Sequence, residues 1–218
     1  MSDPWALAAI FAALAMGGFL KGAIGLGTPV LAIPVMSAIF DVRTAVVLMV
    51  LPNLITNIWQ FWCHHRRILG QGLYLRYAVG AAIGVAVGTV LLVRMSGAAL
   101  SLAVAAALVA FILLRLTRPD WQLSHSAADK LAAPMGTLAG LLQGAAGLSA
   151  PVMVGYFNAM RLERLVFLPA ASAAFLAMGL TQLPMMTAMG LMTPELALVS
   201  LFALIPLLAL MPVGAWVA

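Results

Sequence analysis

One charged side chain stands inside an otherwise apolar stretch of the chain. Lys21 lies in GGFLKGAIGLGTPVLAIP, residues 17–34, which carries no other charge. A lysine within a membrane segment costs roughly 3 kcal/mol on insertion scales unless it is paired or hydrated. Two interpretations are open: Lys21 takes part in substrate or proton chemistry, or its long side chain reaches the nearer interface. At a binding site, its charge would favour an anionic substrate.

A second copy of this stretch, GTLAGLLQGAAGLSAP, occupies residues 136–151, offset by 122 residues from the first. The offset pairs Gly22 with Gly144, Gly25 with Gly147, Pro29 with Pro151, Lys21 with Gln143, and Gly27 with Ser149. Two glycine-broken apolar segments at matching places predict the binding site of a secondary transporter. Half-helix N-termini bind anions through free N–H groups, so two such tips meeting near the membrane midplane would hold an oxyanion. The alternative is that the glycines only pack helices together.

Polar side chains also share one face of a helix predicted at about 44–63. Asn53, Thr56, Asn57 and Gln60 recur at three- and four-residue spacing, so they lie on one stripe. They either line the pathway or hydrogen-bond neighbouring helices. The predicted substrate-binding residues are Lys21, Gly22, Gly25, Gly27, Thr28, Asn53, Asn57, Gln60, Gln143, Gly144, Gly147, Ser149 and Gln182, the last being the 122-offset mate of Gln60.

The composition identifies the surroundings of these residues. Of the 218 residues, 65% are hydrophobic and only 8% charged, whereas soluble domains carry about 25% charged residues. The chain is therefore predicted to be a multi-pass membrane protein with the lipid bilayer as its solvent. The net charge of +5 is typical of loops at a membrane and does not indicate nucleic acid. Cys63-His64-His65 is interpreted as a polar helix end, so no metal or cofactor is expected.

The elements that position these residues are predicted to be helices throughout. They are expected at about 4–21, 29–40, 44–63, 77–93, 98–116, 131–142, 151–160 and 165–183, with one more from 194. The predicted fold is an all-α polytopic membrane protein with two homologous repeats, each opening with a glycine-broken helical hairpin. The first repeat covers residues 1–116, a polar linker 117–130, and the second repeat 131–218. The counterpart of 98–116 would begin near residue 220, so the second repeat is expected to lack its last helix.

Short sequence motifs add detail to several of these predicted helices. The N-terminal run lacks the positive start of a signal peptide and has Asp3 instead, so it is predicted to be a retained first helix. Gly80, Gly84 and Gly88 form a small-residue face for close helix packing. Asp41 and Glu163, another pair at the 122 offset, are expected to cap the helices that follow them.

The basic residues favour one topology over another. If each broken segment crosses the membrane once, the loops divide the Lys and Arg residues six to four. If each broken segment is a hairpin that enters and returns, the division becomes eight to two, with only Arg43 and Arg94 on the poorer side. The positive-inside rule therefore favours the hairpins. This arrangement gives each repeat an odd number of passes, so the two repeats have inverted topology.

Three segments carry a resemblance to a known family. GFLKGAIGLGTPVLAIPV, its copy GLLQGAAGLSAPVMVGYF and the following PNLITNIWQ resemble the sulfite exporter TauE/SafE family, also called the toluene sulfonate uptake permease family. The resemblance implies a small bacterial inner-membrane transporter that moves sulfite or an organosulfonate. Many members carry a Gly-Gly-Gly run where this chain has Gly27-Thr28-Pro29. The usual serine before the first motif glycine is Lys21 here, similar to a lysine-bearing subgroup.

The leading hypothesis is a secondary transporter of a small anion that works by alternating access. Coupling to protons or another ion is expected because the chain has no Walker-type phosphate loop. A homo-oligomer is compatible with the sequence. The alternatives are a non-transporting membrane subunit and a transporter of an unrelated small solute. An intramembrane enzyme is disfavoured because the three histidines, His64, His65 and His125, lie in predicted loops away from Ser149,.

Overall fold

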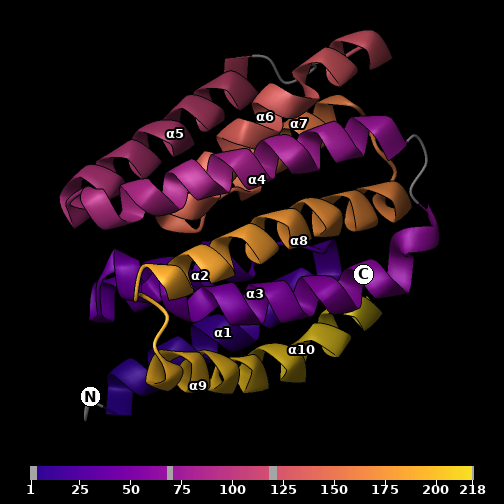
Figure 1. Cartoon of the computed structure of the whole chain (residues 1–218). Helices are drawn as coiled ribbons and strands as arrows, with labels where there is room; N and C mark the ends of the chain where they lie inside the picture. The colour runs from indigo at the N-terminus through magenta and orange to yellow at the C-terminus, as the bar shows by residue number, and fades with distance from the viewer. Residues whose placement is uncertain (1–3, 68–70, 118–121, 218) are drawn as a thin grey trace.

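The fold was examined in a computed structural model that describes residues 4–67, 71–117 and 122–217. These residues form helices joined by short connections, and they contain no strand. The elements are α1 (Pro4–Ile24), α2 (Thr28–Ile39), α3 (Val42–His64), the short 3₁₀ helix η1 (His65–Arg67), α4 (Gln71–Arg94), α5 (Gly97–Thr117), α6 (His125–Ala146), α7 (Ala150–Ala159), α8 (Arg164–Ala188), α9 (Pro194–Phe202) and α10 (Leu204–Val217). The helices run side by side in one bundle (Figure 1). Five described helical segments are long and apolar enough to cross a membrane, and α9 with α10 counts as one of them.

Helices α1 and α2 form a hairpin. The Thr28 hydroxyl at the start of α2 donates to the carbonyl of Gly17, 3.1 Å away, midway along α1. At the other end of α2, Phe40 lines a small cavity together with Leu7 of α1, so the two helices are antiparallel. Gly25, with φ of 82°, supports the reversal because that conformation disfavours other residues. Helix α1 continues to Ile24 and therefore past the predicted end at residue 21.

Helices α6 and α7 form a second hairpin. Gly147 adopts the left-handed conformation and donates its N–H to the Gln143 carbonyl at 2.7 Å, a common way to end a helix. The Leu123 N–H, just before α6, donates to the carbonyl of Ala159 at the end of α7, so these helices are also antiparallel. Helix α6 begins at His125, inside the linker expected at 117–130, and residues 118–121 lie outside the described part of the chain.

Glycines bring α4 and α6 into close contact. A Cβ atom on Gly84 would collide with the Thr137 carbonyl, and one on Gly140 would collide with the Ala81 carbonyl. Gly88 lies in the same way against the Leu141 carbonyl. Because the residue numbers on the two helices rise together, α4 and α6 are parallel. The predicted small-residue face is confirmed, and its partner is a second glycine-rich face.

Helices α1 and α10 repeat this arrangement. Cβ atoms on Gly18 and Gly22 would collide with the carbonyls of Leu207 and Met211, and one on Gly214 with that of Phe19. With the 122-residue offset, Gly18 corresponds to Gly140 and Gly22 to Gly144, both of which face α4 in the same manner. In the second pair, α1 therefore takes the place that α6 has in the first pair, and α10 takes the place of α4.

Helices α3 and α8 pack against each other in the middle of the bundle, between the α4–α6 and α1–α10 pairs (Figure 1). Leu54 of α3 touches Gly179 of α8, whereas Gln60 and Leu168 both lie against Gly25. A later residue of α3 thus lies near an earlier residue of α8, so the two helices are antiparallel. At the start of α3, Asp41 caps the helix by accepting the Thr44 N–H at 2.9 Å, as predicted. Glu163 is the N-cap residue of α8 but makes no side-chain capping bond.

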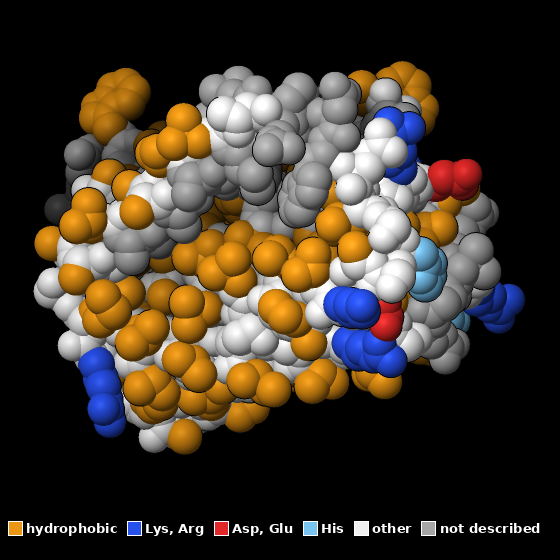
Figure 2. All heavy atoms as spheres, turned by 90° about the horizontal axis from the view of Figure 1, so that it is seen from above, with side chains coloured by type: hydrophobic (Ala, Val, Ile, Leu, Met, Phe, Trp, Pro, Cys, Tyr) orange, Lys and Arg blue, Asp and Glu red, His pale blue; other side chains and the backbone are white. Residues whose placement is uncertain are grey.

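The two ends of the bundle differ in charge. Arg43 donates to the carbonyls of Leu92 and Val93, which places it at one end with Arg94. At the other end, Tyr74, His125 and Met160 line one cavity. Figure 2 shows most of the charged and His side chains of the visible face at one end, basic side chains also at the opposite end, and an apolar surface between them.

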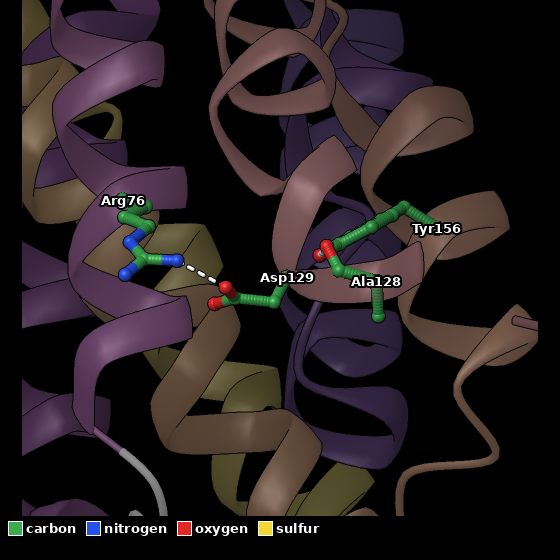
Figure 3. Close-up of polar contacts among 4 residues, drawn as sticks. All are labelled: Arg76, Ala128, Asp129 and Tyr156. Carbon is green, nitrogen blue, oxygen red and sulfur yellow. Dashed lines mark hydrogen bonds and ion pairs between the residues drawn. The ribbon is translucent and has the colours of Figure 1, made fainter. Parts of the chain in front are cut away.

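One ion pair ties α4 to α6 at this more highly charged end. Arg76 of α4 forms an ion pair with Asp129 of α6, while the Tyr156 hydroxyl of α7 donates to the Ala128 carbonyl at 2.6 Å (Figure 3). These two contacts hold α4 and α7 to the first turns of α6.

Candidate anion-binding site

Lys21 is buried in the middle of the protein. Its side chain is 1% exposed, and its Nζ lies 3.4 Å from Oδ1 of Asn53 on α3. The same nitrogen lies 5.6 Å from the centre of the Phe175 ring on α8, within the range of a cation–π contact. The interpretation in which Lys21 reaches an interface is therefore wrong, because its ammonium group ends among three helices.

The charge of Lys21 has no counterion within the described residues. Within that part of the chain, its ammonium group contacts the Asn53 side-chain oxygen and the face of the Phe175 ring, and neither group carries a formal negative charge. A buried charge without a partner is costly, so such a site favours an anion that would neutralise it. Lysine, with three donors on a compact charge, suits a small oxyanion.

The polar stripe of α3 faces protein, as its spacing predicted. Asn57 Nδ2 donates to the Asn53 backbone oxygen at 2.7 Å and to Asn53 Oδ1 at 2.9 Å. Asn53 Oδ1 is thus shared by Asn57 and Lys21. The Thr56 hydroxyl, in contrast, donates to the Pro52 carbonyl of its own helix at 2.7 Å, a structural role.

Two buried oxygens on this stripe have no hydrogen-bond partner among the residues that the structure describes. They are Oδ1 of Asn57 and Oε1 of Gln60, both on residues that are almost fully buried. Buried polar atoms are nearly always satisfied in folded proteins, and an exception at a cluster with a free charge indicates a place for a ligand. Gln60 also lies against Gly25, where a Cβ would come within 3.1 Å of Nε2, so the first hairpin tip adjoins the stripe.

The second hairpin tip forms a separate group. Ser149 donates its hydroxyl to Oε1 of Gln143 at 2.8 Å, and both side chains are buried. Gly147 lies against Ile33 and Val46, near the start of α3, whereas Gly25 lies against Gln60 near its end. Val46 and Gln60 are fourteen residues apart, about 21 Å along a helix. The expectation that the two tips meet at the midplane is therefore wrong, because each hairpin crosses most of the bundle before it turns.

The structure places the other predicted residues as follows. Gly22 and Gly144 face the backbones of α10 and α4. Thr28 bonds to Gly17, and Gly27 is the residue before α2, next to Leu20. Gln182 is buried on α8, and its Nε2 has no hydrogen-bond partner within the described part of the chain. A substrate contact for each of these residues stays a prediction.

Phe175 is the contact that the sequence analysis missed. It is buried on α8 and faces the Lys21 ammonium group. The 122-residue offset aligns it with Asn53, so the offset that paired Gln60 with Gln182 would also have pointed to position 175. The site thus takes Lys21 from α1, amides from α3 and an aromatic wall from α8.

The arrangement is suited to binding, because a buried cation beside amide groups can hold a small anion. Among the described residues no group of three metal-ligating side chains is found. His64 and His65 bond through Nδ1 to carbonyls of α3, and Ser149 is occupied by Gln143. Ionisable side chains buried inside multi-pass helical membrane proteins commonly mark substrate or ion pathways, as in membrane transporters.

The comparisons with known proteins identify the family. Residues 9–218 match the family described as Sulfite exporter TauE/SafE, nearly the whole chain, so the protein belongs to the sulfite exporter TauE/SafE family. No curated protein and no solved structure matches it. Membership implies a membrane transporter of sulfur anions, in agreement with a bilayer environment and a small anionic substrate.

Proposed function

We propose that the protein is a secondary transporter that carries a small sulfur oxyanion, sulfite or an organosulfonate, across a bacterial inner membrane by alternating access. The observation that carries this proposal is Lys21, a buried cation without a counterion among the described residues, beside amides with unmet hydrogen bonds. Transport is coupled to protons or another ion. The end that holds Arg76 and Arg164 faces the cytoplasm.

The proposal includes two repeats of inverted topology, at residues 1–116 and 131–218. Helices α3 and α8 occupy equivalent places under the 122-residue offset and are antiparallel, as inverted repeats require. The glycine contacts of α1 with α10 resemble those of α6 with α4: Gly214 meets Phe19, and Gly88 meets Leu141, the 122-offset mate of Phe19. Gly88 and Gly214 themselves are 126 residues apart, four more than the offset. Inverted repeats place a substrate site at the interface between the halves, where Lys21 and Phe175 meet.

The chain offers a matched test of the charge. It contains two lysines, Lys21 and Lys130, of which the first is buried and the second exposed. In liposomes loaded with sulfite or ethanesulfonate, Lys21→Met is expected to lower the initial flux at least about tenfold, because a charge-assisted bond is lost. Lys130→Met is expected to leave flux within about twofold of the wild type.

Equal flux in the two variants would show that the charge of Lys21 is not needed for transport. Absence of sulfite and sulfonate flux in the wild type, with the protein correctly inserted, would overturn the proposed function itself. Gel filtration and thermal unfolding of each variant show whether a loss of flux comes from misfolding.

A further inference from the structure

The residues around Lys21 offer a ligand both hydrogen-bond donors and hydrogen-bond acceptors. The ammonium group supplies donors and a positive charge, which suit an oxyanion. The unmet atoms on the same face of α3 as Asn53 are Oδ1 of Asn57 and, farther along the helix, Oε1 of Gln60, and these oxygens are acceptors. A ligand that offers only acceptors would satisfy Lys21 and leave both amide oxygens unpaired.

The orientation of the Asn57 amide is determined by its neighbours. Its Nδ2 donates to two oxygens of Asn53, the backbone oxygen at 2.7 Å and Oδ1 at 2.9 Å. Turning the amide over would place Oδ1 against these two acceptors, so the observed orientation follows from the hydrogen-bond network. The unmet group on Asn57 is therefore an acceptor, and it requires a donor from elsewhere.

The charge and the unmet acceptor are close enough for one small ligand. Lys21 Nζ and Asn57 Nδ2 both lie within 3.4 Å of Oδ1 of Asn53. The unmet Oδ1 of Asn57 is part of the same amide group as Asn57 Nδ2. The surroundings restrict the size of the ligand, because Lys21, Asn53 and Asn57 are all buried. Phe175 adds an apolar ring beside the ammonium group, which fits a short hydrocarbon segment.

We propose that the site prefers a small oxyanion that also carries a hydrogen-bond donor, with the anionic oxygens on Lys21 and the donor on Asn57 Oδ1. Hydrogen sulfite and hydroxyalkanesulfonates belong to this class, whereas the sulfite dianion and plain alkanesulfonates do not. The inference rests on the proposed function, since it specifies the substrate of the same site. It adds a requirement for a donor that the Lys21 charge alone does not impose.

Two sulfonates of equal charge and similar size distinguish the requirement for a negative charge from the requirement for a hydrogen-bond donor. 2-Hydroxyethanesulfonate and ethanesulfonate differ by one hydroxyl group. Their dissociation constants are measured by calorimetry on the full chain in lipid nanodiscs. The wild type is expected to bind the hydroxylated anion about tenfold more tightly, because ethanesulfonate leaves the Asn57 oxygen buried and unpaired.

Two variants in α3 test whether Asn57 causes the preference for the hydroxylated sulfonate. Asn57→Leu removes the unmet acceptor at nearly constant volume and is expected to bring the two dissociation constants within about twofold of each other. Thr56→Val, whose hydroxyl bonds only to its own helix, is the matched control and should keep the tenfold preference.

The wild-type ratio decides the inference even if Asn57→Leu does not fold. Equal affinity of the wild type for the two sulfonates overturns it, as does a preference that persists in a folded Asn57→Leu protein. Lys21-dependent flux without a preference for the hydroxyl would overturn only the donor requirement and leave the proposed function intact. If neither sulfonate binds and no flux is measured, both the inference and the proposed function are overturned.

Discussion

At the scale of single residues, the candidate site joins side chains from three helices: Lys21 from α1, Asn53 from α3 and Phe175 from α8. Lys21 stood out as a charge in an apolar run, and helical spacing placed Asn53, Asn57 and Gln60 on one face. Both features are local and can be counted along the chain. The contact with Phe175 is not local, because it depends on how α8 crosses α1 and α3. Periodicity within one helix says nothing about the angle at which another helix crosses it.

Asp41 offers a test of helix capping outside the membrane. Burial raises the pKa of its carboxyl, but hydrogen bonds from Thr44 and the nearby Arg43 charge outweigh this effect, so the pKa is lowered. Asp41→Ala is expected to lower the free energy of unfolding by about 1 kcal/mol at neutral pH, as the loss of an N-cap does. The measurement is denaturant unfolding of the protein in micelles.

The same residue predicts a pH dependence. A carboxyl whose pKa is lowered on folding stabilises the folded state above its unfolded pKa of about 3.9, and this stabilisation is lost as the pH falls through the lower folded value. The advantage of the wild type over Asp41→Asn, which retains a capping side chain, should therefore shrink below about pH 4. A constant difference between the two proteins from neutral to acidic pH would contradict the assignment.

At the scale of elements, short motifs predicted which helix faces pack but not against what. The spacing of Gly80, Gly84 and Gly88 indicated close packing, and the structure shows the partner to be α6. The glycine at position 22 was predicted to break α1, yet the helix continues through it because Gly22 contacts α10. Glycine is required both at helix ends and at close helix contacts, and sequence alone does not separate the two uses.

Two glycines of α4 provide a matched test of this packing. Gly84→Ala places a Cβ against the Thr137 carbonyl, whereas a Cβ on Gly72 meets nothing within 4 Å. Overpacking costs about 1–3 kcal/mol, so Gly84→Ala is expected to lower the unfolding temperature. Gly72→Ala should leave it unchanged or raise it slightly, because alanine favours helix. Equal unfolding temperatures of the two variants would show that the α4–α6 contact is looser than described.

At the scale of the whole molecule, composition was sufficient for the fold class but not for the path of the hairpins. A chain with 8% charged residues and continuous apolar runs of about 20 residues is expected to be helical in lipid, since a helix of that length spans the bilayer and pairs its own backbone groups. The loop charges favoured hairpins, and the antiparallel contacts of α1 with α2 and of α6 with α7 show them. The depth of each tip could not be predicted, because it depends on contacts of Gly25 and Gly147 with distant helices.

The orientation in the membrane is testable with two exposed glycines. In a Cys63→Ser background, Gly97→Cys is expected to react with a membrane-impermeant maleimide added to intact cells. Gly72→Cys should react only after permeabilisation, because it lies at the end that carries Arg76, the end proposed to face the cytoplasm. Both positions leave room for a side chain.

The reverse labelling pattern would invert the proposed orientation. Labelling of both positions from outside would show that α4 does not cross the membrane. Either result would leave the helix packing itself unchanged.

The contact between α1 and α10 has a consequence for synthesis of the protein. Gly18 and Gly22 face Leu207 and Met211, so α1 enters the membrane long before its partner exists. At about 5–20 residues per second, the ribosome needs roughly 10–40 s to add the intervening chain. During that interval the glycine face of α1 is open to lipid or to membrane chaperones. The contact between α1 and α10 therefore forms only after the helices between them have been synthesised.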